Sequence, residues 1–434
     1  MTRERIELSP EELPRRWYNI LCDLPEPLPP YRSMGEGKEI RSLPNCFTKT
    51  ASRLEFSDER WINIPEKVAA TYILCGRPRP LVRAFGLEKY LKTCARIYYK
   101  CEDLSPVGTF KTNASIPQAY WAMKEGYSRT VFSSSLKTRT HFVHTFSARN
   151  YGLTPTIFIP RGDYESNSDQ VLFLEKMFGA NLVESPSRLT SYGSKILSED
   201  SDHQGTSEIA RQEAVEEVKE KPDAIAVISS FLNHVLMTQT IIGLEVEKQL
   251  DLADERPTTL IAPVGGGSNF YGLIAPFVRD FIKGKLSDVN FLAVESETSS
   301  KLTDGEYGYF QLQNPAGEVK GKVYEVKRRL VPSIAGVGIQ TSNTAPILSH
   351  LHRLGFIDTV AYPHDEAAVF EAARIFLETE GILIAPESAY AVRAAIDEAV
   401  KAKRENVERV IVMSISAKSF LDFGEKERYV RQAT

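Results

Sequence analysis

Short apolar runs rich in β-branched residues alternate along the chain with longer segments in which apolar residues recur every three or four positions. The short runs predict β-strands and the longer segments predict amphipathic helices. The predicted strands are 96–100, 129–135, 154–160, 223–230, 258–264, 290–295 and 409–416. The clearest predicted helices are 115–126, 168–179, 236–250 and 366–381. This alternation is typical of βαβ units and favours an α/β fold with parallel sheets covered on both faces.

The chain is too long for a single compact core. Its 434 residues predict two doubly wound parallel-sheet domains, with a cleft between them where ligands of open α/β sheets bind. We expect an N-terminal arm and shared elements over 1–100, an N-terminal α/β domain over 101–225 and a C-terminal α/β domain over 226–434. Residues 13–37, rich in Pro and Arg, predict an extended arm packing on its own domain. The polar stretch 197–223 predicts a seam between domains, although an acidic helical face has the same pattern.

Composition and charge narrow the classes of function. With 42% hydrophobic residues and a net charge of −4, the chain has no electrostatic reason to bind nucleic acid. No apolar run approaches the roughly 18 residues of a membrane span, and the first residues lack the apolar core of a secretory signal. The five cysteines are scattered without a CxxC pair, which favours neither a disulfide framework nor a zinc site. We expect a cytoplasmic protein.

Two segments contain the candidate chemistry. Lys111 lies in LSPVGTFKTN (104–113), a run of turn-forming residues directly after a predicted strand. The second segment, 258–277, has a glycine-rich turn between a predicted strand and a predicted helix. The residues of this turn are Gly265, Gly266, Gly267, Ser268 and Asn269. Glycines allow close approach of an anion and a helix start offers free N–H groups, so the turn predicts a phosphate cradle. The alternatives are a surface lysine and a plain βα turn.

A lysine and a phosphate cradle together match what pyridoxal 5'-phosphate requires. Its aldehyde forms a Schiff base with a lysine whose pKa is lowered by burial, and its phosphate needs fixed N–H donors. Ser416 ends the last predicted strand, and a neutral hydroxyl beside the pyridine nitrogen would leave that nitrogen unprotonated. Such a ring favours loss of a β-substituent over deeper carbanion chemistry. A helix N-cap explains Ser416 equally well.

The chain resembles the tryptophan synthase β chains, and more closely their second group, β chain 2, among the fold-type II pyridoxal phosphate enzymes. The resemblance covers nearly the whole chain. The matching segments are 13–30, 75–84, 95–113, 233–245, 264–269 and 379–398, with the strand that ends at Ser416. NHVLMTQTIIGLE (233–245) and the Arg-rich N-terminal arm are specific to the second group.

The resemblance implies a role for each of these residues. Lys111 forms the Schiff base and 265–269 hold the cofactor phosphate, while Ser416 faces the pyridine nitrogen. Asn113 lies beside the phenolic oxygen of the cofactor, and Glu380 lies near its ring. The family joins indole, supplied by an α subunit, to a serine-derived group, and the second group is associated with O-phospho-L-serine in place of L-serine. The resemblance therefore implies a tryptophan synthase β subunit that binds an α subunit and forms a homodimer.

Several positions depart from the family pattern. The family glutamate that assists proton transfers falls on Ser133, where a hydroxyl is a poor replacement because its pKa lies far from neutral. Ser133 begins SSSLKTRT (133–140), which replaces the loop that binds the substrate carboxylate. The histidine that usually precedes the lysine is Phe110. The other departures are IQTSN (339–343) and SAKS (416–419).

Two interpretations of the altered loop remain open. In the first, Ser135, Lys137, Thr138 and Arg139 bind the substrate, with the two cations pairing with its carboxylate or with a phosphoserine phosphate. Phosphate leaves more readily than hydroxide, so loss of the glutamate is then tolerated. In the second, the loop has drifted, its charges are merely solvated, and the protein binds the cofactor with little activity.

Two rival functions follow. One is another pyridoxal phosphate β-replacement or β-elimination enzyme, such as a cysteine-synthase-like protein. Those families usually follow the lysine with Asp-Arg, whereas this chain has Thr112–Asn113. The other is a weakly active subunit that mainly activates an α subunit. His141 and His144 lack a third ligand at matching spacing, so we expect no metal site. Glu387 is interpreted as a helix-terminus residue near the site and not as a catalyst.

Overall fold

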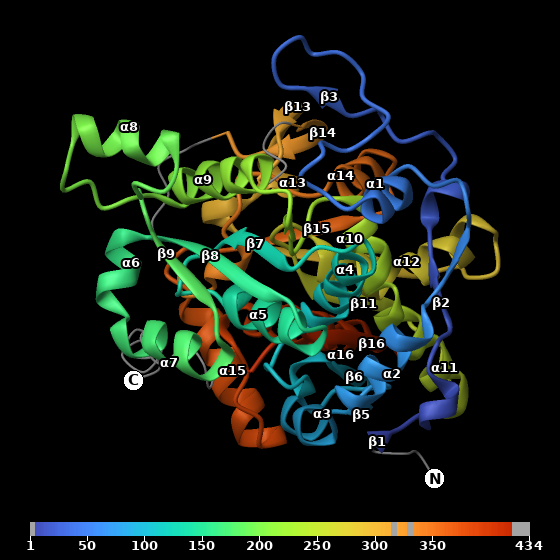
Figure 1. Ribbon diagram of the computed structural model, residues 1–434. Coiled ribbons are helices and arrows are strands. Elements are labelled where there is room, and N and C mark those ends of the chain that lie inside the picture. The colour runs from blue at the N-terminus through green and yellow to red at the C-terminus, as the bar shows by residue number, and fades with distance from the viewer. Residues whose placement is uncertain (1–4, 314–318, 328–333, 419–434) are drawn as a thin grey trace.

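The computed structural model describes residues 5–313, 319–327 and 334–418, and its largest sheet has seven strands in the order β1-β5-β6-β16-β11-β12-β15 (Figure 1). These strands are β1 (Arg5–Ile6), β5 (Leu81–Arg83), β6 (Arg96–Cys101), β11 (Thr259–Pro263), β12 (Asn290–Ser296), β15 (Asp358–Tyr362) and β16 (Val410–Ile415). The five strands from β6 to β15 are parallel, while β5 and β1 pair antiparallel at one side. This arrangement brings the ends of β6, β16 and β11 together at one edge.

The second sheet has four strands, all parallel, in the order β10-β7-β8-β9. They are β7 (Arg129–Ser133), β8 (Thr154–Pro160), β9 (Asn181–Ser185) and β10 (Ala224–Ala226). Helices α5 (Thr140–Asn150) and α9 (Ser207–Glu220) both pack on β7 and β8. Figure 1 shows α9 on one side of these strands and α5 on the other. The sheet is therefore covered on both faces, as a parallel sheet requires.

Smaller sheets and further helices complete the described fold. The strands of the smaller sheets are β2 (Arg16–Tyr18), β3 (Arg32–Ser33), β4 (Trp61–Asn63), β13 (Glu306–Gln311) and β14 (Val319–Glu325). The remaining α-helices are α1 (Lys49–Glu55), α2 (Glu66–Leu74), α3 (Phe85–Leu91), α4 (Thr112–Lys124), α6 (Arg161–Ser166), α7 (Ser168–Phe178), α8 (Ser191–Glu199), α10 (Asn233–Gln239), α11 (Ile241–Ala253), α12 (Ser268–Ile282), α13 (Lys301–Asp304), α14 (Pro346–Arg353), α15 (Ala367–Glu380) and α16 (Pro386–Glu405). None of the described helices combines the length and apolar character that a membrane span needs.

The predicted α/β class with parallel sheets is confirmed, and each predicted strand has a counterpart. The predicted helix 236–250 is divided into α10 and α11 at Thr240. Strands β9 and β15 were not predicted, because both lie at sheet edges and include polar residues. Edge strands face water on one side, so they lack a continuous apolar run. The stretch 197–223 contains the acidic helix α9, and the domain boundaries given above stay predictions.

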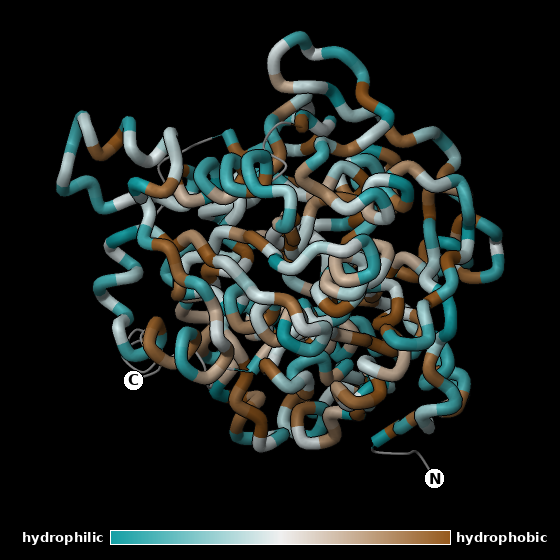
Figure 2. The backbone as a smooth tube through the Cα atoms, viewed as in Figure 1, coloured by the Kyte–Doolittle hydropathy of each residue, from teal (hydrophilic) through white to brown (hydrophobic). Residues whose placement is uncertain are grey.

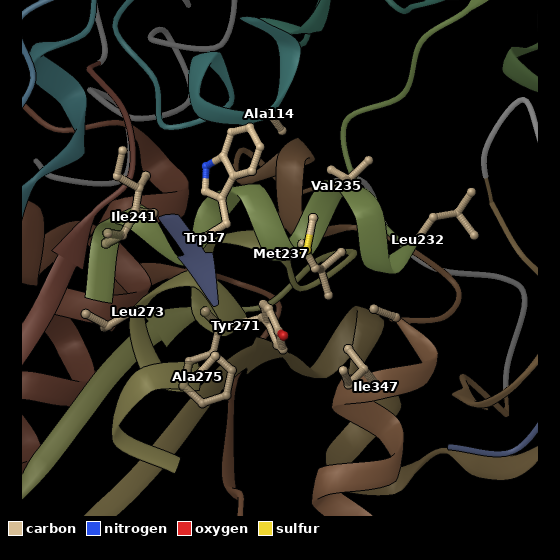
Figure 3. Close-up of a cluster of buried hydrophobic side chains, with 14 of the residues drawn as sticks. Trp17, Ala114, Leu232, Val235, Met237, Ile241, Tyr271, Leu273, Ala275 and Ile347 are labelled. Carbon is tan, nitrogen blue, oxygen red and sulfur yellow. The ribbon is translucent and has the colours of Figure 1, made fainter. Parts of the chain in front are cut away.

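The N-terminal arm packs into the largest apolar core. Trp17 and Tyr18 of β2 are buried. The backbone N–H of Tyr18 donates to the Thr240 hydroxyl at 3.0 Å, and the Trp17 ring meets Trp121 edge to face, with 6.3 Å between the ring centroids. Figure 3 shows the Trp17 ring pointing toward Ala114 of α4. Along the chain, hydrophobic segments lie mostly inside the molecule, and many outer loops are hydrophilic (Figure 2).

Candidate active site

A cavity of about 1180 Å³ opens where strands of both sheets end. Residues that follow the carboxyl ends of β6, β7, β10, β11, β12 and β16 line it. Open parallel sheets bind ligands at these ends, because the helices on both faces leave a crevice there. Lys111, the glycine-rich turn and Ser416 all lie in this lining. The structure therefore brings together three features that lie up to 305 residues apart in the sequence (111 and 416).

Lys111 lies directly before α4, and the residue that precedes it is hydrogen-bonded to Ser416. The backbone N–H of Phe110 donates to the carbonyl oxygen of Ser416 at 3.0 Å. The Lys111 Nζ donates to the Thr140 hydroxyl at 3.0 Å, and the Ser416 hydroxyl lies 3.0 Å from that of Ser388. Burial lowers the pKa of the Lys111 ammonium from 10.5 to about 8, although Glu387 opposes the shift. Lys111 thus holds a proton only loosely near neutral pH.

The start of α4 fixes the position of Lys111. Pro117 lies inside α4 and has no N–H to donate to the carbonyl of Asn113 four residues earlier. The Tyr72 hydroxyl donates to that carbonyl instead. The Arg79 guanidinium also donates to the Thr112 hydroxyl at 3.3 Å. Both groups anchor the turn that follows Lys111, so the lysine projects from a rigid support.

The side chain of Asn113 points away from the cavity and does not lie in its described lining. Its amide N–H groups donate to Glu102 at 2.9 Å and to Gln239 at 3.0 Å. Its amide oxygen accepts from Arg77 at 2.9 Å. These buried partners satisfy the amide completely. The structure therefore differs from the predicted position beside the cofactor, because charged groups on the opposite side hold this side chain.

Glu380 also lies outside the described lining of the cavity. It ends α15, and its carboxylate accepts the backbone N–H of Leu87 at 2.7 Å, in the first turn of α3. A carboxylate is stabilised there by the positive end of the helix dipole. The sequence prediction of a place near the cofactor ring is not matched in this structure.

The glycine-rich turn has the shape of an anion cradle. Gly267 has φ +94°, which favours glycine. A Cβ atom at Gly265 would collide with the carbonyl of Gly338, and a Cβ atom at Gly267 would collide with Leu348. The turn leads into α12, and no side chain caps the start of that helix. The first N–H groups of α12 therefore have no partner within the helix and can donate to an anion.

The residues around this turn fit pyridoxal phosphate. The hydroxyl of Ser230 is buried in the cavity lining beside Gly266, and it has no hydrogen-bond partner among the described residues. The Ser268 hydroxyl donates to the Ser229 carbonyl at 3.2 Å, and the amide oxygen of Asn269 accepts from Ser414 at 3.0 Å. A phosphate would accept hydrogen bonds from the Ser230 hydroxyl and from the N–H groups at the start of α12. The cradle and the lysine amine thus face the same cavity.

In the loop 133–140, which replaces the family carboxylate site, some side chains line the cavity and others face solvent. Lys137 does not line the cavity; its ammonium faces Asp163 at 3.6 Å and its side chain is 56% exposed. The Ser135 hydroxyl, in the lining, donates to the same carboxylate at 2.6 Å. Thr138 and Arg139 also line the cavity. Of the two predicted cations, only Arg139 is therefore placed to meet a substrate.

Arg139 and Glu387 face each other across the cavity. Arg139 is 7% exposed and directly precedes α5, on the side of the smaller sheet. Glu387 lies in the first turn of α16, on the side of the larger sheet. Arg139 Nη1 lies 3.7 Å from Glu387 Oε2. The sequence placed Glu387 at a helix terminus near the site, as found, but gave no sign of this ion pair.

Sequence reasoning missed other residues of the lining. His144 lies in the cavity wall, and its Nε2 lies 2.8 Å from the Ser229 hydroxyl. Burial and the charge of Lys111 lower the pKa of His144 to about 3, so its ring is neutral. Arg211 of α9 also lines the cavity and pairs with Glu208. Arg211 falls within an acidic polar stretch, and nothing in the sequence marks it. Among the described residues no group of three or more His, Cys, Asp or Glu could hold a metal ion.

The comparisons with known proteins agree with the geometry. The model of the family described as "Pyridoxal-phosphate dependent enzyme" matches residues 73–416. The chain is 40% identical over 427 residues to "Tryptophan synthase beta chain 2" of Thermotoga maritima, covering 96% of this chain and 98% of the relative. It is also 40% identical over 426 residues to "Tryptophan synthase beta chain" of Pyrococcus horikoshii, covering 98% of this chain and 92% of the relative.

Solved structures share the fold at much lower identity. The threonine deaminase isoform 2 of Solanum lycopersicum is 17% identical with a TM-score of 0.61, covering 85% of this chain and 91% of that chain. The L-serine ammonia-lyase of Rhizomucor miehei is 18% identical with a TM-score of 0.59, covering 82% of this chain and 98% of that chain. By the family model and the near full-length relatives, the chain belongs to the tryptophan synthase β chain family of pyridoxal-phosphate dependent enzymes.

Proposed function

We propose that this chain is a tryptophan synthase β subunit that joins indole to L-serine or O-phospho-L-serine and forms L-tryptophan. One observation supports the proposal above the others: Lys111, the glycine-rich cradle and Ser416 open into one cavity in a chain of this family. The altered loop retains a buried cation, Arg139, in the lining. The cavity therefore has a group that can bind the carboxylate of an amino acid.

Three parts of the lining would hold the cofactor. Residues 265–269 would bind its phosphate through backbone N–H groups, the Lys111 amine would meet its aldehyde, and the Ser416 hydroxyl would face its pyridine nitrogen. When bound, pyridoxal phosphate supplies an electron-accepting ring that stabilises negative charge on the carbon atoms of an amino acid. A neutral serine hydroxyl does not protonate the ring nitrogen, which suits β-replacement chemistry.

The chain's own residues provide the proton chemistry and the binding surfaces. The Lys111 amine, with a pKa of about 8, can take the α-proton of the donor amino acid and return it, since its pKa lies near the working pH. The Thr140 hydroxyl keeps Nζ in place at 3.0 Å. Phe231 and Phe310 line the cavity and offer apolar surface to the indole ring.

An assay with two donors tests the proposal. Purified protein loaded with pyridoxal phosphate is given indole and either L-serine or O-phospho-L-serine, each with and without an α subunit. Formation of L-tryptophan from either donor supports the proposal. Release of ammonia and a keto acid without L-tryptophan would indicate β-elimination instead. Silence under all four conditions would indicate a subunit that mainly binds its partner.

We also propose an α-subunit partner, a homodimer and a cytoplasmic location. Support for the partner comes from the names of the relatives, which are β chains. Light scattering of the purified protein measures the number of subunits, and stimulation of the assay by an α subunit measures the partnership. Fractionation of the source cells tests the location.

A further inference from the structure

The proposed reaction needs a proton donor for the leaving group that Ser133 cannot provide. When L-serine is the donor, its hydroxyl must leave as water, and indole must lose a proton from C3. The first step calls for a group that gives a proton near neutral pH, whereas the C3 proton of the adduct is acidic enough to pass to water. Ser133 ends β7 in the cavity lining, but a hydroxyl has no useful pKa there. Another side chain of the lining must therefore take this role.

Three carboxylates lie in the described lining of the cavity: Glu208, Glu325 and Glu387. Glu208 pairs with Arg211 of the same helix, and its side chain is 58% exposed. Glu325 lies at the end of β14 and accepts from the Asn343 amide at 3.3 Å. Only Glu387 has an electrostatic effect on Lys111, whose charge it stabilises. Glu387 is thus the carboxylate of the lining that lies nearest the chemistry.

The two oxygens of Glu387 have different surroundings. Oε1 accepts the backbone N–H of Gly338 at 2.9 Å. A Cβ atom at Gly338 would lie 2.6 Å from Oε1, so a side chain at this position would displace the carboxylate. Oε2 faces Arg139 Nη1 at 3.7 Å, which is longer than the 2.7–2.9 Å typical of a charge-assisted hydrogen bond. Glu387 is therefore anchored by one oxygen and loosely paired through the other.

Arg139 is the cation expected to bind the substrate, so the substrate and Glu387 compete for it. A carboxylate on the substrate can form two parallel hydrogen bonds with a guanidinium. The pair with Glu387 spans the cavity from the side of α5 to the side of α16, so binding between these walls separates the two groups. Binding of the substrate carboxylate to Arg139 then also releases Glu387 Oε2 from Arg139.

We propose that the substrate carboxylate takes Arg139 from Glu387 and that Glu387, once released, is the proton-transfer residue that replaces the missing glutamate at Ser133. This inference rests on the proposed function. Glu387 takes a proton from the ammonium group of the substrate and gives it to the hydroxyl, whose bond to Cβ breaks as water leaves. After the new bond from Cβ to indole C3 forms, the acidic C3 proton passes to water, and the amino group of the product takes up a proton from water.

The choice of donor separates this role from a structural one. In Glu387→Gln, kcat with L-serine should fall roughly 100-fold or more. With O-phospho-L-serine kcat should fall less than about 10-fold, because phosphate leaves without a proton from the enzyme. KM should fall for both donors, because the substrate no longer competes with a carboxylate for Arg139. Glu398→Gln, farther along α16 where Glu398 pairs with Arg409, is the matched control. An equal loss with both donors would overturn the proposal.

A second measurement needs no turnover. The apparent pKa of Lys111 is obtained from the pH dependence of its acylation in the cofactor-free protein, with the labelled peptide quantified by mass spectrometry. Glu387→Gln should lower this pKa below about 8, and Arg139→Gln should raise it, because the two charges act on Lys111 in opposite directions. If both variants leave it unchanged, Glu387 does not face Lys111 and the proposal fails, whether or not the protein forms L-tryptophan.

If Glu387→Gln does not fold, a variant with a shorter carboxylate provides a second test of the role of Glu387. Glu387→Asp retains the charge but draws it back from Arg139 and Lys111. It should lose activity with L-serine more than with O-phospho-L-serine, by a smaller factor than the glutamine variant. Full activity with L-serine in Glu387→Asp would contradict the need for a carboxylate at this reach.

Discussion

Two groups of charged side chains flank the first turn of α4, and they differ in the distances between their charged atoms. The group behind the turn consists of Arg77, Arg79, Lys100, Glu102 and Glu245, all buried. Each of its cations contacts a carboxylate, at distances of 2.5–2.7 Å. The group in front of the turn, toward the cavity, consists of Lys111, Arg139 and Glu387, with 3.7 Å between the last two.

The pKa values show what this difference means. Burial alone would raise the pKa of Glu102, but the charges of Arg77 and Arg79 lower it to about 2. Glu102 is therefore fixed as a carboxylate at any physiological pH. Burial lowers the pKa of Lys111 to about 8, with only partial compensation from Glu387. Closely paired buried charges lock one protonation state, whereas a buried lysine with partial compensation can exchange its proton near neutral pH.

The largest effect is expected at the lysine itself. Lys111→Ala should reduce formation of L-tryptophan by at least about 1000-fold, because the nucleophilic amine and the proton carrier are lost together. It should also remove the visible absorbance of the bound cofactor. Lys124→Ala, an exposed lysine on the same helix, should keep both. Retained activity in Lys111→Ala would contradict the assignment of the cavity as the active site.

Substitutions in the group behind the turn should change the stability of the protein and not its chemistry. Glu102→Gln removes the carboxylate that pairs with Arg79 and leaves Arg77 paired with Glu245 alone, so the free energy of unfolding should fall by about 3–5 kcal/mol. The exposed pair of Arg96 with Glu408 is the control, and Glu408→Gln should cost at most about 1 kcal/mol. Denaturant titration measures both. Equal costs would remove the distinction between the two groups.

Arg139 should affect the affinity for the substrate. In Arg139→Gln the KM for the donor amino acid should rise roughly 10–100-fold, the effect of losing a hydrogen bond between charged groups. Indole carries no charge, so its KM should change little. Arg149→Gln, exposed at the end of the same helix α5, is the control. A normal KM in Arg139→Gln would mean that another cation, such as Arg211, binds the carboxylate.

The smallest effect concerns pH. A lysine with a lowered pKa is neutral above about pH 8 instead of above 10.5, so acylation of Lys111 in the cofactor-free protein should rise with a midpoint near pH 8. An added reference peptide with a free lysine side chain should rise with a midpoint more than one pH unit higher. Mass spectrometry of the two peptides over a pH series compares them within one sample. Coincident midpoints would show that burial does not perturb Lys111.

The sequence by itself determined the repeating strand and helix order and the chemistry of its two conspicuous motifs. Apolar periodicity is a local property, so strands such as 96–100 and 258–264 were predicted correctly. The glycine-rich turn was recognisable because only glycine permits the backbone of Gly267. The pairing of Lys111 with this turn followed from what the cofactor requires, and the family motifs extended it.

Only the tertiary structure decided which side chains face the cavity. Asn113 is two residues from Lys111, yet buried charged and polar side chains from three other segments hold it on the opposite side. Lys137 and Arg139 are equally cationic in the sequence, but Asp163 draws the first outward while the second is buried in the lining. The contact between Arg139 and Glu387 joins positions 248 residues apart (139 and 387). Such contacts depend on long-range packing of the two sheets, which local periodicity does not encode.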